Sequence, residues 1–490
     1  MGFSLSESVT TAPTTGAAPD NSARNRLVIT LLLISTFVVF LNETLMGNAM
    51  PALMEDLRIT ADAAQWVTTA FLLTMAVVIP ITGFLLQRLN TRTVFITAMS
   101  LFSVGTLLAA VAPGFEFLIL ARVVQASGTA IMMPLLFTTV LTLVPMQSRG
   151  RVMGNISIVI SVAPALGPLV SGLILGAFHW RFLFVLILPI AIAALIIGAR
   201  RVPNVTEPTH TSIDVFSVIL SAFGFGGLVF GLSNVGTAGI GAVITWAPLA
   251  VGVAGITVFV LRQLVLQRTD AALLDLRTFK VRTFMFAVLM LTISMMALFG
   301  TVILLPIFTQ NVMELDARTT GLILLPGGLI MGLLGPVVGR AYDRIGPRPL
   351  VVAGSIVVSS ALWSMTMLTA DAEIWMVLVA YTTLTIGLGL LFTPLFTAGL
   401  GDIPPKLYSH GSAVVGTIQQ LAGAAGVALF ITVMSATSLA QLDRGATEVA
   451  ATAAGIHTAF IYGAVISLVA IPLAFFIRKP AQVSEFSGGH

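Results

Sequence analysis

The feature that most limits the fold of this chain is a series of apolar runs, each roughly 20 residues long, separated by segments rich in charge, proline or glycine. A helix of that length crosses the hydrocarbon core of a bilayer, because it rises about 1.5 Å per residue. Counting the runs along the chain gives about fourteen spans. The sequence therefore predicts an all-α polytopic membrane protein.

Composition excludes several classes of function. Only 9% of the residues are charged and 57% are hydrophobic, whereas a soluble domain carries about 25% charged residues. The absence of cysteine excludes disulfides, thiolate catalysis and cysteine metal sites. The sequence shows no phosphate-binding loop of the ATPase type, so we expect neither an enzyme nor a bound metal or cofactor. The basic residues lie in short loops, which argues against nucleic acid as a partner.

Lysine and arginine are distributed unevenly between the two sides of the expected membrane. Nineteen of the 24 basic residues lie in the N-terminal tail or in alternate segments on its side, four lie on the other side, and Arg122 lies within a run. Short loops rich in Lys and Arg stay in the cytoplasm. We therefore expect a multi-pass protein of the cell membrane, with an even number of spans and both termini in the cytoplasm.

The chain also repeats itself. Residues 83–92 correspond to residues 339–348 at an offset of 256, and residues 133–138 are echoed more loosely by residues 393–397. The first correspondence relates the second apolar run to the tenth, and the other relates the fourth to the twelfth, so the copies are eight runs apart. A plain duplication of a six-helix unit would place the copies six runs apart. Two helices are therefore inserted between the halves. Repeated halves are typical of alternating-access transporters.

These counts predict two six-helix bundles and an inserted helix pair. The expected division is a disordered cytoplasmic tail (1–26), a first bundle (27–200), a linker with the inserted pair (201–262), a cytoplasmic loop (263–282), a second bundle (283–478) and a second cytoplasmic tail (479–490). Asp214 begins the seventh apolar run and Asp275 lies in the cytoplasmic loop 263–282, and we expect both to be surface acids.

Glu43 is the one acid expected deep in the membrane, because it lies in an apolar run of about 27–50. Ionisable groups at that depth are expensive and are by default candidates for function. Burial favours the neutral form of a carboxyl, which allows it to take up and release protons near neutral pH. The alternatives are a permanently protonated acid that only hydrogen-bonds a neighbouring helix, or an acid that outer water solvates.

Arg122 is expected at the same depth as Glu43, roughly 10 Å from the outer end of its helix at about 1.5 Å per residue. A guanidinium there either pairs with the ionised Glu43 or polarises the route by which protons reach it. The alternative is an arginine that extends to water or caps backbone carbonyls.

Several motifs occur together at matching positions of the chain. Residues 339–348 read Gly-x-x-x-Asp-Arg-x-Gly-x-Arg, and residues 83–92 form a weaker copy with Gln87 and Asn90 in place of Asp and Gly. Residues 122–128 read Arg-x-x-Gln-Ala-x-Gly, and residues 167–172 read Gly-Pro-x-x-Ser-Gly. In these motifs the chain resembles the major facilitator superfamily, and within it the fourteen-helix drug:proton antiporters of the lincomycin-resistance type.

The resemblance implies a proton-coupled transporter that exports drugs or other lipophilic or cationic small molecules by alternating access. A proton gradient would be its energy source, and its partners would be a drug-like substrate, protons and membrane lipid; we expect a monomer. In that family the first-span motif usually begins Leu-Asp, whereas this chain has Asn42 at the Asp position and Glu43 one residue later. Two alternatives stay open, a proton-coupled transporter of a specific lipid or metabolite and a membrane sensor or scaffold, although the short loops argue against the second.

Three groups of site residues follow. Small residues and a proline allow close approach and a kink in the antiporter motif, at Gly167, Pro168 and Gly172. A carboxylate, glycines and basic residues form a candidate cytoplasmic gate, at Gly339, Asp343, Arg344, Gly346, Arg348, Arg88 and Arg92. Amides and adaptable apolar side chains form a candidate substrate cavity, at Asn42, Met46, Gln125, Met133, Phe308, Gln310 and Gln420.

Overall fold

A computed structural model describes residues 22–205, 208, 213–235, 241–369 and 372–479. These residues form helices and turns, and no strand is present among them. Fourteen helical segments are long and apolar enough to cross a membrane, which confirms the predicted all-α polytopic fold. Most of the two predicted tails lies outside the described residues.

The helices follow one another with short connections. They are α1 (Ser22–Leu45), the short α2 (Met50–Leu57), α3 (Ala61–Arg88), α4 (Thr91–Ala110), α5 (Phe115–Leu143), α6 (Arg149–Leu175), α7 (Phe182–Arg201), α8 (Val215–Asn234), α9 (Ala242–Leu266), α10 (Arg282–Ile307), α11 (Ala317–Ile345), α12 (Pro347–Met365), α13 (Ile374–Gly401), α14 (Tyr408–Leu442) and α15 (Glu448–Ala474). α9 continues four residues into the predicted loop 263–282.

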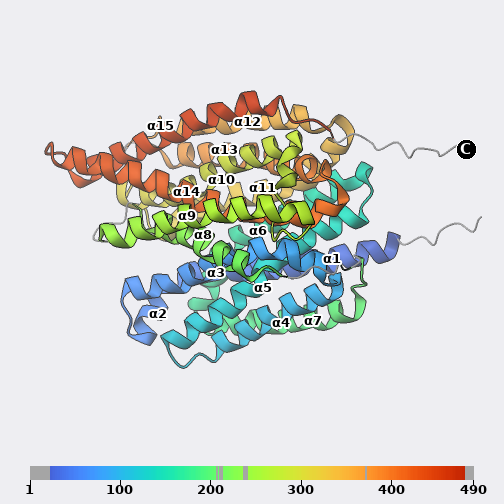
Figure 1. Ribbon diagram of the computed structural model, residues 1–490. Helices are drawn as coiled ribbons and strands as arrows, with labels where there is room; N and C mark the ends of the chain where they lie inside the picture. The colour runs from blue at the N-terminus through green and yellow to red at the C-terminus, as the bar shows by residue number, and fades with distance from the viewer. Residues whose placement is uncertain (1–21, 206–207, 209–212, 236–240, 370–371, 480–490) are drawn as a thin grey trace, which may run out of the picture.

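Helices α1 to α7 form one group and α10 to α15 form a second, with α8 and α9 alongside both (Figure 1). We call them the first half, the second half and the inserted pair. α8 packs against α9, against α3 of the first half and against α14 of the second half. The beginning of α1 and the end of α15 lie at the same end of the molecule, which we call the terminal end, and α2 lies at the opposite, far end.

The two halves are packed together at the terminal end. α6 packs along α11, and α3 packs along α14. A Cβ on Gly154 would clash with the carbonyl oxygen of Gly335, and a Cβ on Gly335 would clash with that of Gly154, so only glycine permits this approach of α6 to α11. Ser157 and Thr393, on α6 and α13, share a hydrogen bond of 2.6 Å between their hydroxyls.

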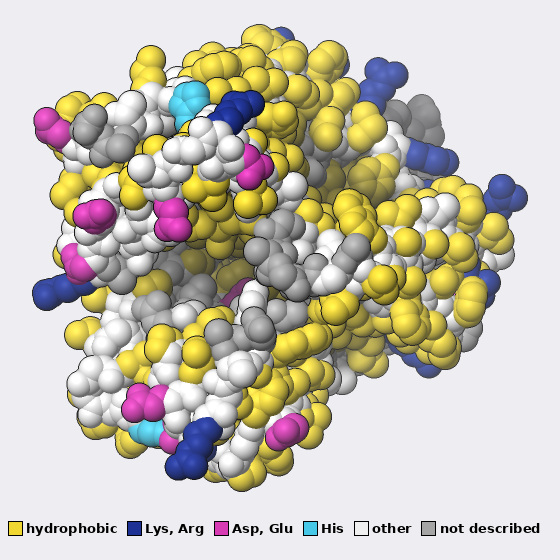
Figure 2. Space-filling view, turned by 90° about the vertical axis from the view of Figure 1, so that its left-hand side faces the viewer, with side chains coloured by type: hydrophobic (Ala, Val, Ile, Leu, Met, Phe, Trp, Pro, Cys, Tyr) yellow, Lys and Arg dark blue, Asp and Glu magenta, His cyan; other side chains and the backbone are white. Residues whose placement is uncertain are grey.

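The far end is open. Figure 2 looks onto this end and shows a hollow between the two groups of helices. The structure therefore has one conformation of a two-sided molecule, in which the halves are joined at the terminal end and separated at the far end.

Candidate functional site

Glu43 lies near the end of α1, where the helical geometry changes. Residues Met46–Ala49 form the 3-10 turn η1, and α2 continues from Met50 to Leu57. Pro51 has no amide hydrogen to donate to the carbonyl four residues earlier, which favours a tighter turn there. Because the backbone stays helical, Glu43 lies within the helical run, roughly 20 Å from its end at about 1.5 Å per residue. This is farther from the end than the sequence indicated, since we expected the helix to end near Met50.

The antiporter-motif helix α6 packs directly on this part of α1. A Cβ on Gly167 would clash with the side chain of Thr44, so glycine is needed for the crossing. Ser171 Oγ donates to the carbonyl of Leu45 at 2.8 Å. Gly172 differs from Gly167, because apart from the adjacent part of α6 no atom of the described residues lies within 4 Å of the position of its Cβ. Pro168, like Gly172, is exposed.

Arg122 is fully buried in α5 and holds a polar network. Its Nη1 donates to Gln125 Oε1 at 2.6 Å and to Asn42 Oδ1 at 3.4 Å, and its guanidinium carbon lies 4.0 Å from the centre of the Phe71 ring. Gln125 Nε2 donates in turn to Thr106 Oγ1 at 2.7 Å. A buried guanidinium needs such partners, and here they come from α1, α3, α4 and α5.

Glu43 is half-buried beside this network, close enough to Arg122 for their charges to interact. No ion pair or hydrogen bond of Glu43 is found among the side chains that the structure describes. Arg122 instead contacts Asn42, the residue before Glu43, and the Nδ2 of Asn42 is buried with no hydrogen-bond partner in the described part of the chain. The arginine therefore has neutral partners only, and its charge remains available to act on Glu43.

The residues predicted for a substrate cavity have different environments in this conformation. Met46, Met133 and Phe308 are buried. Gln310 is exposed and Gln420 is half-buried. The Gln420 amide lies 3.9 Å from the sulfur of Met75, which places α14 and α3 in contact across the two halves.

The second copy of the repeated segment joins the halves at the terminal end. Asp343 of α11 accepts hydrogen bonds from the backbone amides of Gly150 and Arg151, both at 2.9 Å. These amides belong to the first turn of α6, where unpaired N–H groups and the helix dipole favour a carboxylate. Gly346 follows with a φ of 81° in the turn to α12. The basic members of the motif, Arg344 and Arg348, are exposed.

The first copy of the repeated segment occupies a corresponding place, where α3 ends and α4 begins. Gln87 Nε2 donates to the carbonyl of Lys406 at 3.0 Å, next to the start of α14. A Cβ on Gly83 would lie 3.1 Å from the His410 ring, 3.2 Å from the Ala413 Cβ and 3.3 Å from the His410 Cα, which is close contact but not a clash. Arg88 and Arg92 are exposed. Each copy thus reaches the start of a helix in the opposite half.

The expectation that Asp275 is a surface acid was wrong. It is 2% exposed, and its carboxylate accepts from Arg277 at the backbone amide (2.9 Å) and at Nε (3.0 Å). Asp214 is half-buried and pairs with Arg262 of α9, whose guanidinium lowers the pKa of Asp214 to about 2. The spacing Asp-x-Arg could have indicated the local pair at 275–277, but nothing in the sequence brings Asp214 to Arg262.

Two buried residues at the terminal end had no predicted role. Arg149 Nη2 donates to the Leu141 carbonyl at 2.7 Å and to the Tyr408 hydroxyl at 3.2 Å, so it joins α6 to α14. His410 is buried in the first turn of α14, and its Nδ1 has no partner among the described residues. Arg149 opens an apolar run and is not distinguished in the sequence from the exposed Arg151.

The chain has extensive similarity to known proteins. It is 42% identical over 463 residues to the uncharacterized MFS-type transporter YcnB of Bacillus subtilis, covering 94% of this chain and 97% of that protein. It is 40% identical over 457 residues to the lincomycin resistance protein LmrB of Listeria monocytogenes, covering 92% and 96%.

The fold and the family agree with these relatives. The crystal structure of the human organic anion transporter MFSD10 (TETRAN) is similar with a TM-score of 0.65 at 13% identity, over 92% of this chain and 99% of that chain. Residues 32–427 match the Major Facilitator Superfamily. The chain therefore belongs to the major facilitator superfamily of membrane transporters.

Proposed function

We propose that this transporter exports drug-like lipophilic or cationic small molecules across the cell membrane in exchange for protons. The observation that carries the proposal is the position of Glu43, a half-buried acid with no ion pair among the described side chains, beside the buried cation Arg122. Glu43 lies two residues before the end of α1, but η1 and α2 continue the helical run to Leu57. The other acids of the described chain, in contrast, lie in connections or within one turn of the end of their helical run. Similarity to a protein named for lincomycin resistance supports drugs as the substrate class.

The geometry suggests how a proton could be coupled to transport. Burial opposes ionisation of a carboxyl, and a neighbouring guanidinium favours it, so a small change in hydration or distance moves the proton. Asn42 keeps Arg122 in place through a neutral contact of 3.4 Å, which leaves the guanidinium charge uncompensated. When Glu43 is protonated, that cation loses its nearest anion.

The conformational cycle follows from the two ends of the molecule. With both termini in the cytoplasm, as the distribution of basic residues predicts, the far end faces outward. Protons would then reach Glu43 from outside in the conformation described here, while substrate leaves. Separation of α6 from α11 and of α3 from α14 would open the terminal end and allow proton release and substrate loading.

Reconstituted protein tests this proposal. In liposomes with an acidic lumen, a drug:proton antiporter accumulates lincomycin or a lipophilic cation and alkalinises the lumen at the same time. Drug accumulation and the part of the alkalinisation that depends on the drug should both disappear with a protonophore. A transporter of a specific lipid or metabolite would move protons only with its own substrate, and a sensor or scaffold would move neither drug nor protons, so either result would contradict the proposal.

A further inference from the structure

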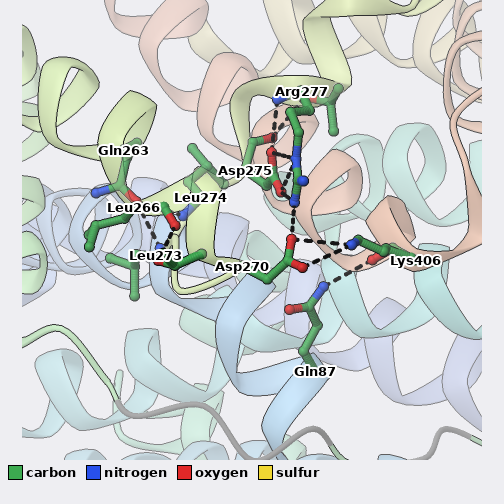
Figure 3. A network of polar contacts seen from close by, with 11 residues as sticks. Gln87, Gln263, Leu266, Asp270, Leu273, Leu274, Asp275, Arg277 and Lys406 are labelled. Atoms are coloured by element: carbon green, nitrogen blue, oxygen red, sulfur yellow. Dashed lines mark hydrogen bonds and ion pairs between the residues drawn. The ribbon is translucent and has the colours of Figure 1, made fainter.

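Lys406, in the second half, contacts both the first half and the loop that follows the inserted pair. It lies in η6 (Pro405–Leu407), the turn that leads into α14. Its carbonyl accepts from Gln87 at 3.0 Å, and its ammonium donates to both oxygens of Asp270 at 3.1 Å. Figure 3 shows the three residues next to one another. Asp270 follows the inserted helix α9, so the inserted pair reaches the contact between the halves.

Asp270 is held in position by its own loop. Arg277 also donates to its carboxylate, and the two cations lower the pKa of Asp270, Arg277 having the larger effect and Lys406 the smaller. The backbone of Asp270 has a φ of 55°, in the left-handed region that Asp tolerates better than most residues. The carboxylate is therefore ionised and fixed in direction at neutral pH.

The loop is anchored to the inserted pair through buried groups. Gln263 of α9 is fully buried, and its Oε1 accepts from the amides of Leu273 and Leu274 at 2.8 and 3.3 Å. Its Nε2 donates to Ser217 Oγ of α8 at 2.8 Å. Arg277 in turn is held by the buried Asp275. A continuous set of contacts thus runs from α8 and α9 to Lys406.

We propose that the inserted pair acts as a latch, in which Asp270 binds Lys406 and holds the terminal end closed. The latch supplies the acid that the first copy of the repeated segment lacks at Gln87. In the second copy, Asp343 is part of the segment itself and binds the opposite half directly. In the first copy, the acid comes from the loop after α9.

The latch is suited to repeated opening. The side chains of Asp270 and Lys406 are 56% and 63% exposed, so their pairing is screened by salt and adds little to the stability of the fold. α8 contacts both α3 and α14, which must separate when the terminal end opens. A weak pair at that point shifts the balance between two conformations without fixing either.

Labelling of a single cysteine tests the latch, because the chain contains none. Ser412 of α14 is fully buried and accepts from Thr138 of α5 across the halves at 3.2 Å. Ser412→Cys should react slowly with a maleimide added from the terminal side. Adding Asp270→Asn should raise that rate about two- to five-fold, since an exposed pair contributes little. Salt should raise the rate in the parent but not in this variant.

Controls separate the latch from a general loss of structure. Lys406→Gln should raise the rate as Asp270→Asn does, and the double variant should add nothing further, because both changes remove the pair between Asp270 and Lys406. The additional contact of Asp270 with Arg277 lies within one loop and is not expected to affect the rate. Asp443→Asn, at an exposed acid after the far end of α14, should leave the rate unchanged. Equal rates in Asp270→Asn and the parent, or additive effects in the double variant, would overturn the latch. Labelling needs neither drug nor proton gradient, so its failure is distinct from a failure of the proposed function.

Discussion

The two copies of the repeated segment occupy corresponding places in the two halves, yet they use different chemistry. At 339–348, the Asp343 carboxylate accepts two backbone amides at the start of α6. At 83–92, Gln87 Nε2 donates to the backbone carbonyl of Lys406, before α14. The contact of Asp343 combines a helix-terminus interaction with charge-assisted hydrogen bonds, whereas the contact between Gln87 and Lys406 joins two neutral groups.

Packing against the opposite half is also tighter at the second copy than at the first. A Cβ on Gly339 would lie 2.2 Å from the carbonyl oxygen of Gly150, whereas a Cβ on Gly83 would meet atoms of His410 and Ala413 no closer than 3.1 Å. The second copy is therefore a rigid, direct joint between the halves. The first copy is a less tightly packed contact, and in the proposed latch its acid is Asp270, in the loop after the inserted pair. In the proposed latch, a segment outside the repeat supplies the charged group that the first copy does not contain.

The largest difference between the copies is expected when the glycine of each is replaced by alanine, which adds a single methyl group. Gly339→Ala places a Cβ against the carbonyl oxygen of Gly150, so the terminal end cannot close fully. Drug transport in liposomes should fall more than about tenfold, a difference of roughly 1.4 kcal/mol in the closed conformation. Gly83→Ala, whose Cβ would meet His410 at 3.1 Å, should retain activity within about threefold of the parent. Equal losses in the two variants would show that the copies are equally rigid.

Removal of the acid should have the next largest effect. Asp343→Asn keeps the shape but leaves one oxygen for the two amides of Gly150 and Arg151. The loss is about 1–2 kcal/mol for a half-buried charged acceptor, so terminal-side labelling of Ser412→Cys should rise about fivefold to thirtyfold. The rise should exceed that of Asp270→Asn. A smaller rise than at Asp270 would reverse the proposed ranking of the two contacts.

An acid at position 87 of the first copy should weaken the contact between α3 and the start of α14. Gln87→Glu removes the amide that donates to the Lys406 carbonyl and offers that carbonyl a second acceptor. We expect labelling of Ser412→Cys to increase about two- to threefold, because one neutral hydrogen bond is lost. Decreased labelling would mean that the first copy still works as an acidic lock.

The smallest effect on the closed terminal end is expected from a substitution at the far end of the first half. Asp56 accepts from Trp180 Nε1 at 2.9 Å and from Arg181 Nη1 at 3.0 Å, and His179 Nε2 lies 3.2 Å from its other oxygen. The hydrogen bonds from Trp180 first, then from His179 and Arg181, lower the pKa of Asp56 to about 2. Asp56→Asn should therefore lower the melting temperature slightly at pH 7 and leave terminal-side labelling unchanged. A folded-state pKa below the usual value gives stability that is present above pH 4 and lost as the pH falls toward 2. The difference between parent and variant should shrink over that range.

Much of the fold could be predicted from the sequence because bilayer length and the repeat are both linear features. The fourteen spans follow from run length alone. The place of the inserted pair stays a prediction from the offset between the copies. Continuation of the first helical run to Leu57 was missed, since Pro51 resembles a stop signal but is tolerated in the first turn of α2.

The side-chain partners in the site could be predicted less well. The sequence indicated Glu43 and Arg122 at one depth, but it could not show that Arg122 donates to Asn42 and Gln125 instead. Helix rotation decides such contacts, and one residue along a helix turns a side chain by about 100°. The contact of Asp270 with Lys406 joins residues far apart in the chain and had no local signal.

The most direct measurement of the central claim is proton and drug flux in Glu43→Gln, beside Glu116→Gln at an exposed acid in the first turn of α5. Glutamine keeps the shape of a protonated carboxyl and cannot release a proton. The account predicts that Glu43→Gln loses drug-coupled proton flux and gradient-driven drug transport, whereas Glu116→Gln keeps both. Intact proton flux and drug transport in Glu43→Gln would contradict it.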